Sequence, residues 1–159
     1  MAEYHNIEPV FDENSGILIL GSFPSVKSRE QRFFYGHPQN RFWRVLAAVF
    51  GEEVPDSVDE KRAFLLRNRI AVWDVIKQCD ITGSGDSTIK NVVPNDIGFI
   101  LSKAEIQRIF CNGQTSYKLY RRYIEKKTGI AAQPLPSTSP ANAQYSIDRL
   151  TKTWQIIAE

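Results

Sequence analysis

Short apolar runs rich in β-branched residues alternate along this chain with segments whose apolar residues recur at helical spacing. The first run, residues 17–20, reads Ile-Leu-Ile-Leu and is closed by Gly21. The first helical segment, residues 42–50, stops before Gly51, as many helices do. Parallel strands need crossover connections, which helices usually supply. The alternation therefore predicts an α/β fold with a largely parallel sheet covered on both faces.

The alternation continues to the C-terminal end and gives four strands in all. Further strands are expected at residues 70–76, 106–111 and 131–135, and further helices at residues 57–69, 94–103, 117–124 and 147–157. Residues 22–38 and 83–87 are expected to be a loop and a turn. Ligands of such sheets bind at the carboxyl ends of the strands. The length of 159 residues predicts one domain, residues 1–159.

Composition excludes several classes of protein. No apolar run approaches the roughly 20 residues that span a bilayer, and the N-terminal residues have neither a basic start nor an apolar stretch. We therefore expect a cytoplasmic protein without a membrane partner. Cys79 and Cys111 are expected to be core thiols, and His5 and His37 lie far apart, so no metal and no other cofactor is expected.

Positive charge is concentrated in one stretch, although the net charge of the chain is only +2. Within residues 27–44, Glu30 is the single acidic residue, and the basic residues are Lys27, Arg29, Arg32, Arg41 and Arg44. A local basic surface can bind the phosphates of a nucleic acid even when the whole protein is nearly neutral. The same charges could equally form an ordinary solvated surface, so charge alone leaves both interpretations open.

Three loops at the carboxyl ends of the expected strands carry unusual residue types and should converge. Aromatic residues Phe33, Phe34 and Tyr35 occur in the first loop and not on a periodic face. They could stack on a nucleobase or simply anchor the loop by being buried. Asn40 and Asn112 offer amides for a base edge or a water, but they could also cap a helix and form a turn.

These loops contain no pair of a nucleophile and a base. Ser137 and Ser139 have no histidine near them in the sequence, and His37 is followed by a proline. A serine-hydrolase mechanism is therefore disfavoured.

Four segments together resemble the uracil-DNA glycosylase superfamily: residues 21–25 (GSFPS), 37–43 (HPQNRFW), 111–113 (CNG) and 136–142 (PSTSPAN). Within the superfamily they are most similar to the hypoxanthine-DNA (deoxyinosine) glycosylase branch, and the resemblance covers nearly the whole chain. It implies a three-layer α/β/α domain with a four-stranded, mainly parallel sheet, in agreement with the alternation.

The resemblance also implies a role for each candidate residue. Asn40 would be catalytic and would position water, because Phe23 stands where the uracil branches have a polar water-holding residue. The base would be bound by Phe23, Phe34, Tyr35 and Asn112. The loop pressed into the duplex would consist of Ser137, Thr138, Ser139, Pro140 and Ala141, and phosphates would be contacted by Lys27, Arg29, Arg32, Arg41 and Arg44.

The function implied by the resemblance is that of a monofunctional DNA glycosylase, a hydrolase that excises deaminated bases in base excision repair by flipping them out of the duplex. Hypoxanthine is the expected base, with uracil and xanthine as further candidates. The implied partner is DNA that contains a deaminated base, bound by a monomer at the nucleoid without an obligate protein partner. Two alternatives stay open: a mismatch-type uracil-DNA glycosylase, and a catalytically weak DNA-binding module of the same fold.

Overall fold

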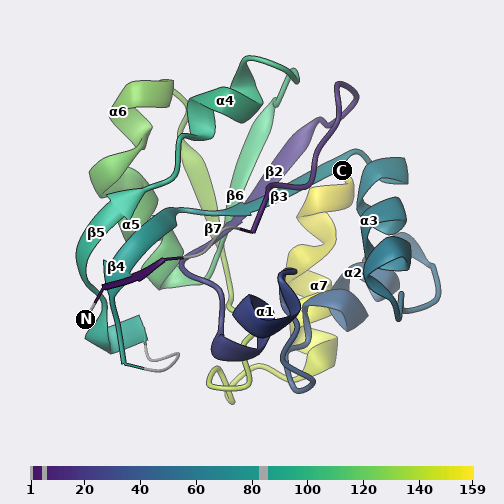
Figure 1. Cartoon of the computed structure of the whole chain (residues 1–159). Helices are drawn as coiled ribbons and strands as arrows, with labels where there is room; N and C mark the ends of the chain where they lie inside the picture. The colour runs from purple at the N-terminus through teal and green to yellow at the C-terminus, as the bar shows by residue number, and fades with distance from the viewer. Residues whose placement is uncertain (1, 5–6, 83–85) are drawn as a thin grey trace.

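Four short strands form a parallel sheet at the centre of the computed structural model, which describes residues 2–4, 7–82 and 86–159 (Figure 1). Their spatial order is β3-β2-β6-β7, with bounds Ile70–Asp74, Ile17–Gly21, Arg108–Asn112 and Ala132–Leu135. All five residues of β2 are buried, because this strand is paired on both edges and covered on both faces. The expected α/β fold is confirmed.

Helices cover both faces of this sheet (Figure 1). They are α1 (Val26–Gln31), α2 (Phe42–Phe50), α3 (Val58–Arg67), α4 (Ile97–Leu101), α5 (Gln114–Tyr123), α6 (Glu125–Thr128) and α7 (Ile147–Trp154), with short 3-10 helices at Asp86–Thr88 and Gln155–Ala158. Alternate residues of β2 point to opposite faces: Ile19 packs in a core with α2, α3 and α7, and Leu20 packs in a second core with α4 and α5.

The strand predicted at residues 70–76 is wrong at its C-terminal end. Strand β3 stops at Asp74, and a separate strand, β4 (Ile76–Asp80), begins after Val75. Strand β4 lies between β1 (Ala2–Tyr4) and β5 (Lys90–Pro94) in a small antiparallel sheet that was not predicted. The N–H of Val75 still donates to Gly21 of β2 (2.8 Å), and where the chain then leaves the central sheet, Asn95 Nδ2 donates to the carbonyls of Asp74 and Ile76 (2.9 and 3.2 Å).

The loop expected at residues 22–38 also contains a helix, α1, that the sequence did not predict. Its N-terminus is capped by Ser25, whose Oγ accepts from the N–H of Ser28 at 3.1 Å. The expected turn at residues 83–87 lies in part outside the described residues. Both cysteines are buried, as expected. Among the described residues, no helix has the length and apolar character needed to cross a bilayer.

Candidate functional site

A cavity of about 410 Å³ lies at the carboxyl ends of the central strands, where the loops after β2, β6 and β7 meet. The three loops that were expected to converge therefore do so. Every residue predicted to be catalytic or base-binding lines this cavity, and so does the whole of the loop 137–141. A second, more open hollow of about 600 Å³ is lined by residues 101–107 with Glu13 and Ile130, and it contains none of the predicted residues.

Asn40 lies at the wall of the cavity, just before α2. Its Oδ1 accepts two hydrogen bonds, from the N–H of Phe42 at 3.0 Å and from the hydroxyl of Thr138 at 2.8 Å. The bond from Phe42 satisfies a donor at the start of α2, so the capping interpretation of Asn40 is compatible with its place in the cavity.

Asn112, the last residue of β6, holds the loop after β7 through its side-chain amide. Its Oδ1 accepts from the N–H of Thr138 at 3.0 Å, and its Nδ2 donates to the hydroxyl of Thr138, also at 3.0 Å. Thr138 is fully buried. Thr138 thus occupies two of the four hydrogen-bond positions of the Asn112 amide, one on its oxygen and one on its nitrogen.

Tyr35 and Phe34 form the aromatic part of the wall. The ring of Tyr35 stacks on Phe42, with centroids 3.9 Å apart and planes at 17°, so only its other face can meet a ligand. The backbone of Tyr35 has a φ of 51°, a left-handed conformation that is uncommon for an aromatic residue. Phe34 is held from behind, because Trp43 Nε1 donates to its carbonyl at 3.3 Å.

The hydroxyl of Tyr35 is buried beside two polar side chains. It has no hydrogen-bond partner among the described residues, although the Asp74 carboxylate and the Asn112 amide are both near enough to influence it. Burial, and then the negative charge of Asp74, raise the pKa of Tyr35 far above its ordinary value of 10. Tyr35 is therefore neutral at physiological pH.

Asp74 is a cavity residue that the sequence analysis missed. It ends β3 opposite Gly21 in the parallel register, is 3% exposed, and lines the cavity. A Cβ atom at Gly21 would lie 2.5 Å from Asp74 Oδ1 and 3.0 Å from the Tyr35 hydroxyl, so the absence of a side chain at Gly21 makes room for both. The one available signal was a carboxylate at the end of an otherwise apolar strand.

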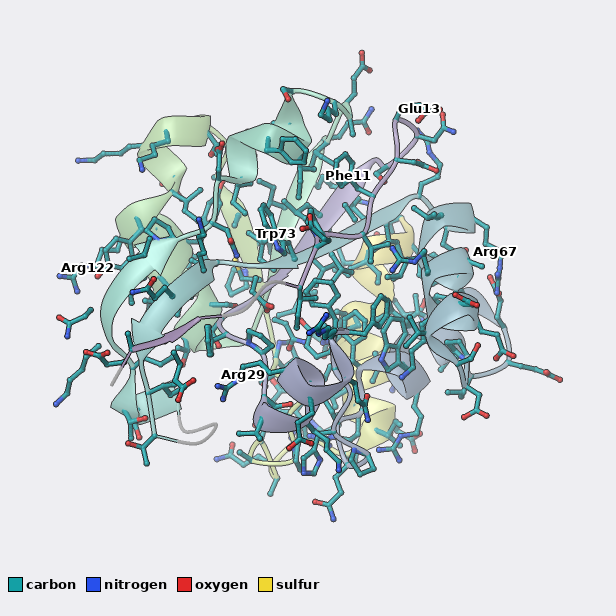
Figure 2. All side chains as sticks on the ribbon, in the orientation of Figure 1. Phe11, Glu13, Arg29, Arg67, Trp73 and Arg122 are labelled. Atoms are coloured by element: carbon teal, nitrogen blue, oxygen red, sulfur yellow. The ribbon has the colours of Figure 1, made fainter. Side chains whose placement is uncertain are left out.

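Phe23 lines the cavity, and so do Ser25 and Ser28 at the start of α1, the helix that carries Lys27 and Arg29. Arg29 is placed 5.1 Å from the ring centre of Phe23 and 3.3 Å from the carboxylate of Glu3, and Figure 2 shows it next to α1. Lys27 and Arg32 are exposed, and Lys27 is 3.8 Å from Glu30 on the same helix. Arg44 is exposed on α2.

Arg41 differs from the other basic residues, because its side chain is directed into the protein. Its guanidinium donates to the backbone carbonyls of Thr138, Ser139, Asn142 and Tyr145. The N–H groups predicted to contact phosphates are thus used to hold the loop that follows β7. Among the described residues, no group of three or more histidine, cysteine or acidic side chains could hold a metal ion.

The chain is similar to known proteins over nearly its whole length. The family model of the uracil DNA glycosylase superfamily matches residues 8–158. A hypoxanthine DNA glycosylase of Methanosarcina acetivorans is 37% identical over 150 residues, which cover 93% of each chain, and one of Methanosarcina barkeri is 35% identical over 136 residues, which cover 84% of this chain and 85% of the relative. The NMR structure of a candidate uracil DNA glycosylase from M. acetivorans superposes with a TM-score of 0.81 at 31% identity over the whole of both chains.

Proposed function

Because the chain belongs to the uracil DNA glycosylase superfamily, we propose that it releases deaminated bases, hypoxanthine first among them, from DNA. Two relatives that carry the name hypoxanthine DNA glycosylase support this choice of base. The observation that carries the proposal is the 410 Å³ cavity, in which aromatic rings and amide groups from separate loops meet at one edge of the sheet. Such a lining suits a planar, polar ligand.

A base inside a duplex cannot reach this cavity, so the nucleotide must be flipped out of the stack. Flipping costs a few kcal/mol, and least at a mismatched pair, which favours deaminated bases over normal ones. The loop 137–141 would press into the duplex beside the flipped nucleotide, as the family resemblance implies. Phosphates on either side would be bound by Lys27, Arg29, Arg32 and Arg44.

The reaction is hydrolysis of the N-glycosidic bond. The bond from C1′ of the sugar to N9 of hypoxanthine breaks with its electron pair going to the base, and the oxygen of a water forms a new bond to C1′. The water supplies hydroxide to the sugar and, in sum, one proton to the base. Tyr35 would stack on the base, Asn112 would donate to its edge, and backbone N–H groups near Phe23 and Phe34 would stabilise its growing negative charge.

A strand-cleaving side reaction would require a lysine that forms a Schiff base with the sugar. Among the residues described, no lysine lines the cavity, and Lys27 lies on the exposed side of α1 with Glu30 as its ionic partner. We therefore propose a monofunctional enzyme that leaves an abasic site. We expect it to act as a monomer on nucleoid DNA in the cytoplasm.

The test is base release from matched duplexes that contain hypoxanthine, uracil or xanthine, followed by alkaline cleavage of the abasic product. Wild type should release hypoxanthine, and Asn40→Ala should lower the rate about 100-fold while DNA affinity stays within about threefold. Asn14→Ala, an exposed asparagine far from the cavity, is the matched control and should not change the rate. Release of uracil alone would favour the mismatch-type uracil enzyme, and salt-sensitive binding without release would favour the binding module.

A further inference from the structure

A chain of three hydrogen bonds joins the two asparagines of the cavity through Thr138. Asn112 Nδ2 donates to Thr138 Oγ1 at 3.0 Å, Thr138 Oγ1 donates to Asn40 Oδ1 at 2.8 Å, and the N–H of Thr138 donates to Asn112 Oδ1 at 3.0 Å. The three residues come from three separate segments of the chain, and Thr138 has no solvent exposure. The hydroxyl of Thr138 therefore forms its hydrogen bonds with the two asparagines and not with solvent.

The direction of this chain is fixed at both ends by backbone N–H groups, which can only donate. At one end, the N–H of Thr138 requires the oxygen of the Asn112 amide to face it, so the nitrogen of Asn112 faces Thr138 Oγ1. Because Oγ1 then accepts from Asn112, its own proton is left for Asn40. At the other end, the N–H of Phe42 independently requires Asn40 Oδ1 to face it.

From this geometry we infer that Thr138 is a positioning residue, which holds the Asn40 amide with its oxygen engaged and its NH₂ group presented to the cavity. Both acceptor positions of Asn40 Oδ1 are filled, by Phe42 and Thr138. In the described part of the chain, Asn40 Nδ2 donates to no protein acceptor, and Asn40 lines the cavity.

The inference rests on the proposed function and deepens it. Asn40 meets the reacting nucleotide as a hydrogen-bond donor, so it can hold a water by the water's oxygen or stabilise negative charge on the departing base. It cannot accept a hydrogen bond from the attacking water. In the alternative role, the amide oxygen of Asn40 would accept a hydrogen bond from the water as the water attacks C1′.

The first experiment separates the effect of the Thr138 hydroxyl from the effect of the side chain's volume. Thr138→Val keeps the volume of the side chain and removes the hydroxyl, whereas Thr138→Ser keeps the hydroxyl. Under single-turnover conditions with a hypoxanthine duplex, we expect Thr138→Val to lower the rate of release about 10-fold or more with DNA affinity nearly unchanged, and Thr138→Ser to stay within about threefold of wild type. Thr151→Val on α7, a half-buried threonine outside the cavity, is the matched control.

The second experiment tests the donor role directly. Asn40→Asp replaces the NH₂ group by an oxygen of the same size, which can accept but cannot donate when it is ionised. If Asn40 acts as a donor, Asn40→Asp should lose as much activity as Asn40→Ala. Activity of Asn40→Asp near or above that of wild type would overturn the inference, since a carboxylate accepts a proton from water better than an amide does.

A third measurement does not need catalysis. In a nitrogen-15 NMR spectrum, the side-chain NH₂ signals of Asn40 and Asn112 should shift in Thr138→Val and keep their wild-type positions in Thr138→Ser. If wild type is active, unchanged NMR signals or an unchanged rate of release in Thr138→Val would overturn the inference about Thr138 and leave the proposed function standing. Wild type that releases no base from any substrate would instead overturn the proposed function, and the NMR signals would still decide the role of Thr138 in orienting the amides.

Discussion

Gly21 has no side chain, which leaves room in the lining of the cavity for Asp74 and Tyr35. Gly21→Ala would place a Cβ 2.5 Å from Asp74 Oδ1 and 3.0 Å from the Tyr35 hydroxyl, distances that force both groups to move. We expect the free energy of unfolding to fall by about 1 to 3 kcal/mol and base release to fall with it.

Gly16 provides the control for this substitution, because it flanks the other end of β2. A Cβ there meets the Arg69 guanidinium at an ordinary 3.8 Å. Urea denaturation should show Gly16→Ala within about 0.5 kcal/mol of wild type. Equal losses in the two variants would mean that crowding by Asp74 and Tyr35 is not the cause.

Tyr35 gives a prediction about pH. Its pKa is raised in the folded protein by burial and by Asp74, so at alkaline pH the unfolded chain ionises this group before the folded protein does. Proton loss from the unfolded state lowers the free energy of unfolding as pH rises through about 10. Urea denaturation at about pH 8 and about pH 11 should therefore show a smaller alkaline loss in Tyr35→Phe than in wild type. A loss of the same size in both proteins would contradict the burial of this hydroxyl.

At the scale of elements, Arg41 connects α2 to the loop after β7. Its guanidinium reaches four backbone carbonyls between Thr138 and Tyr145, which a single ammonium group cannot do. Arg41→Lys should therefore speed amide hydrogen exchange in residues 138–145 and lower base release about 10-fold. Arg122→Lys, on α5 and exposed, should change neither. Unchanged exchange in Arg41→Lys would show that the other hydrogen bonds of the loop, such as those of Thr138 and Asn142, hold it without Arg41.

The central elements could be predicted from the sequence because each has a local signature. Strand β2 is continuously apolar, and α2 has a periodic apolar face followed by Gly51. Strands β4 and β5 have no such signature, since β4 mixes buried and exposed residues, β5 has no buried residue, and the two pair with each other. Helix α1 is only six residues long, and it depends on the Ser25 cap more than on an apolar stripe.

The same limit applies to the site. The motifs predicted Asn40, Asn112 and Thr138 as site residues, and all three line the cavity; the superfamily expected from those motifs is confirmed. Nothing in the sequence showed that the hydroxyl of Thr138 would lie between the two amides, because Asn40 and Thr138 are 98 residues apart in the chain. Asp74 was missed because it was taken as an interior residue of a longer strand.

At the scale of the whole molecule, a net charge of +2 is too small to attract DNA, so binding must come from a local surface. Lys27 and Arg32 are exposed on and just after α1, beside the cavity, whereas Arg122 on α5 points away from the molecule at its left edge in Figure 2. Each phosphate contact that is lost should reduce the slope of log affinity against log salt by about 0.9. Titrations of a lesion-free duplex between about 50 and 200 mM salt should therefore show a reduced slope for Lys27→Ala and for Arg32→Ala, and the wild-type slope for Arg122→Ala. A slope reduced by Arg122→Ala and unaffected by the other two would place the DNA on α5 and separate it from the cavity, which the proposed reaction does not allow.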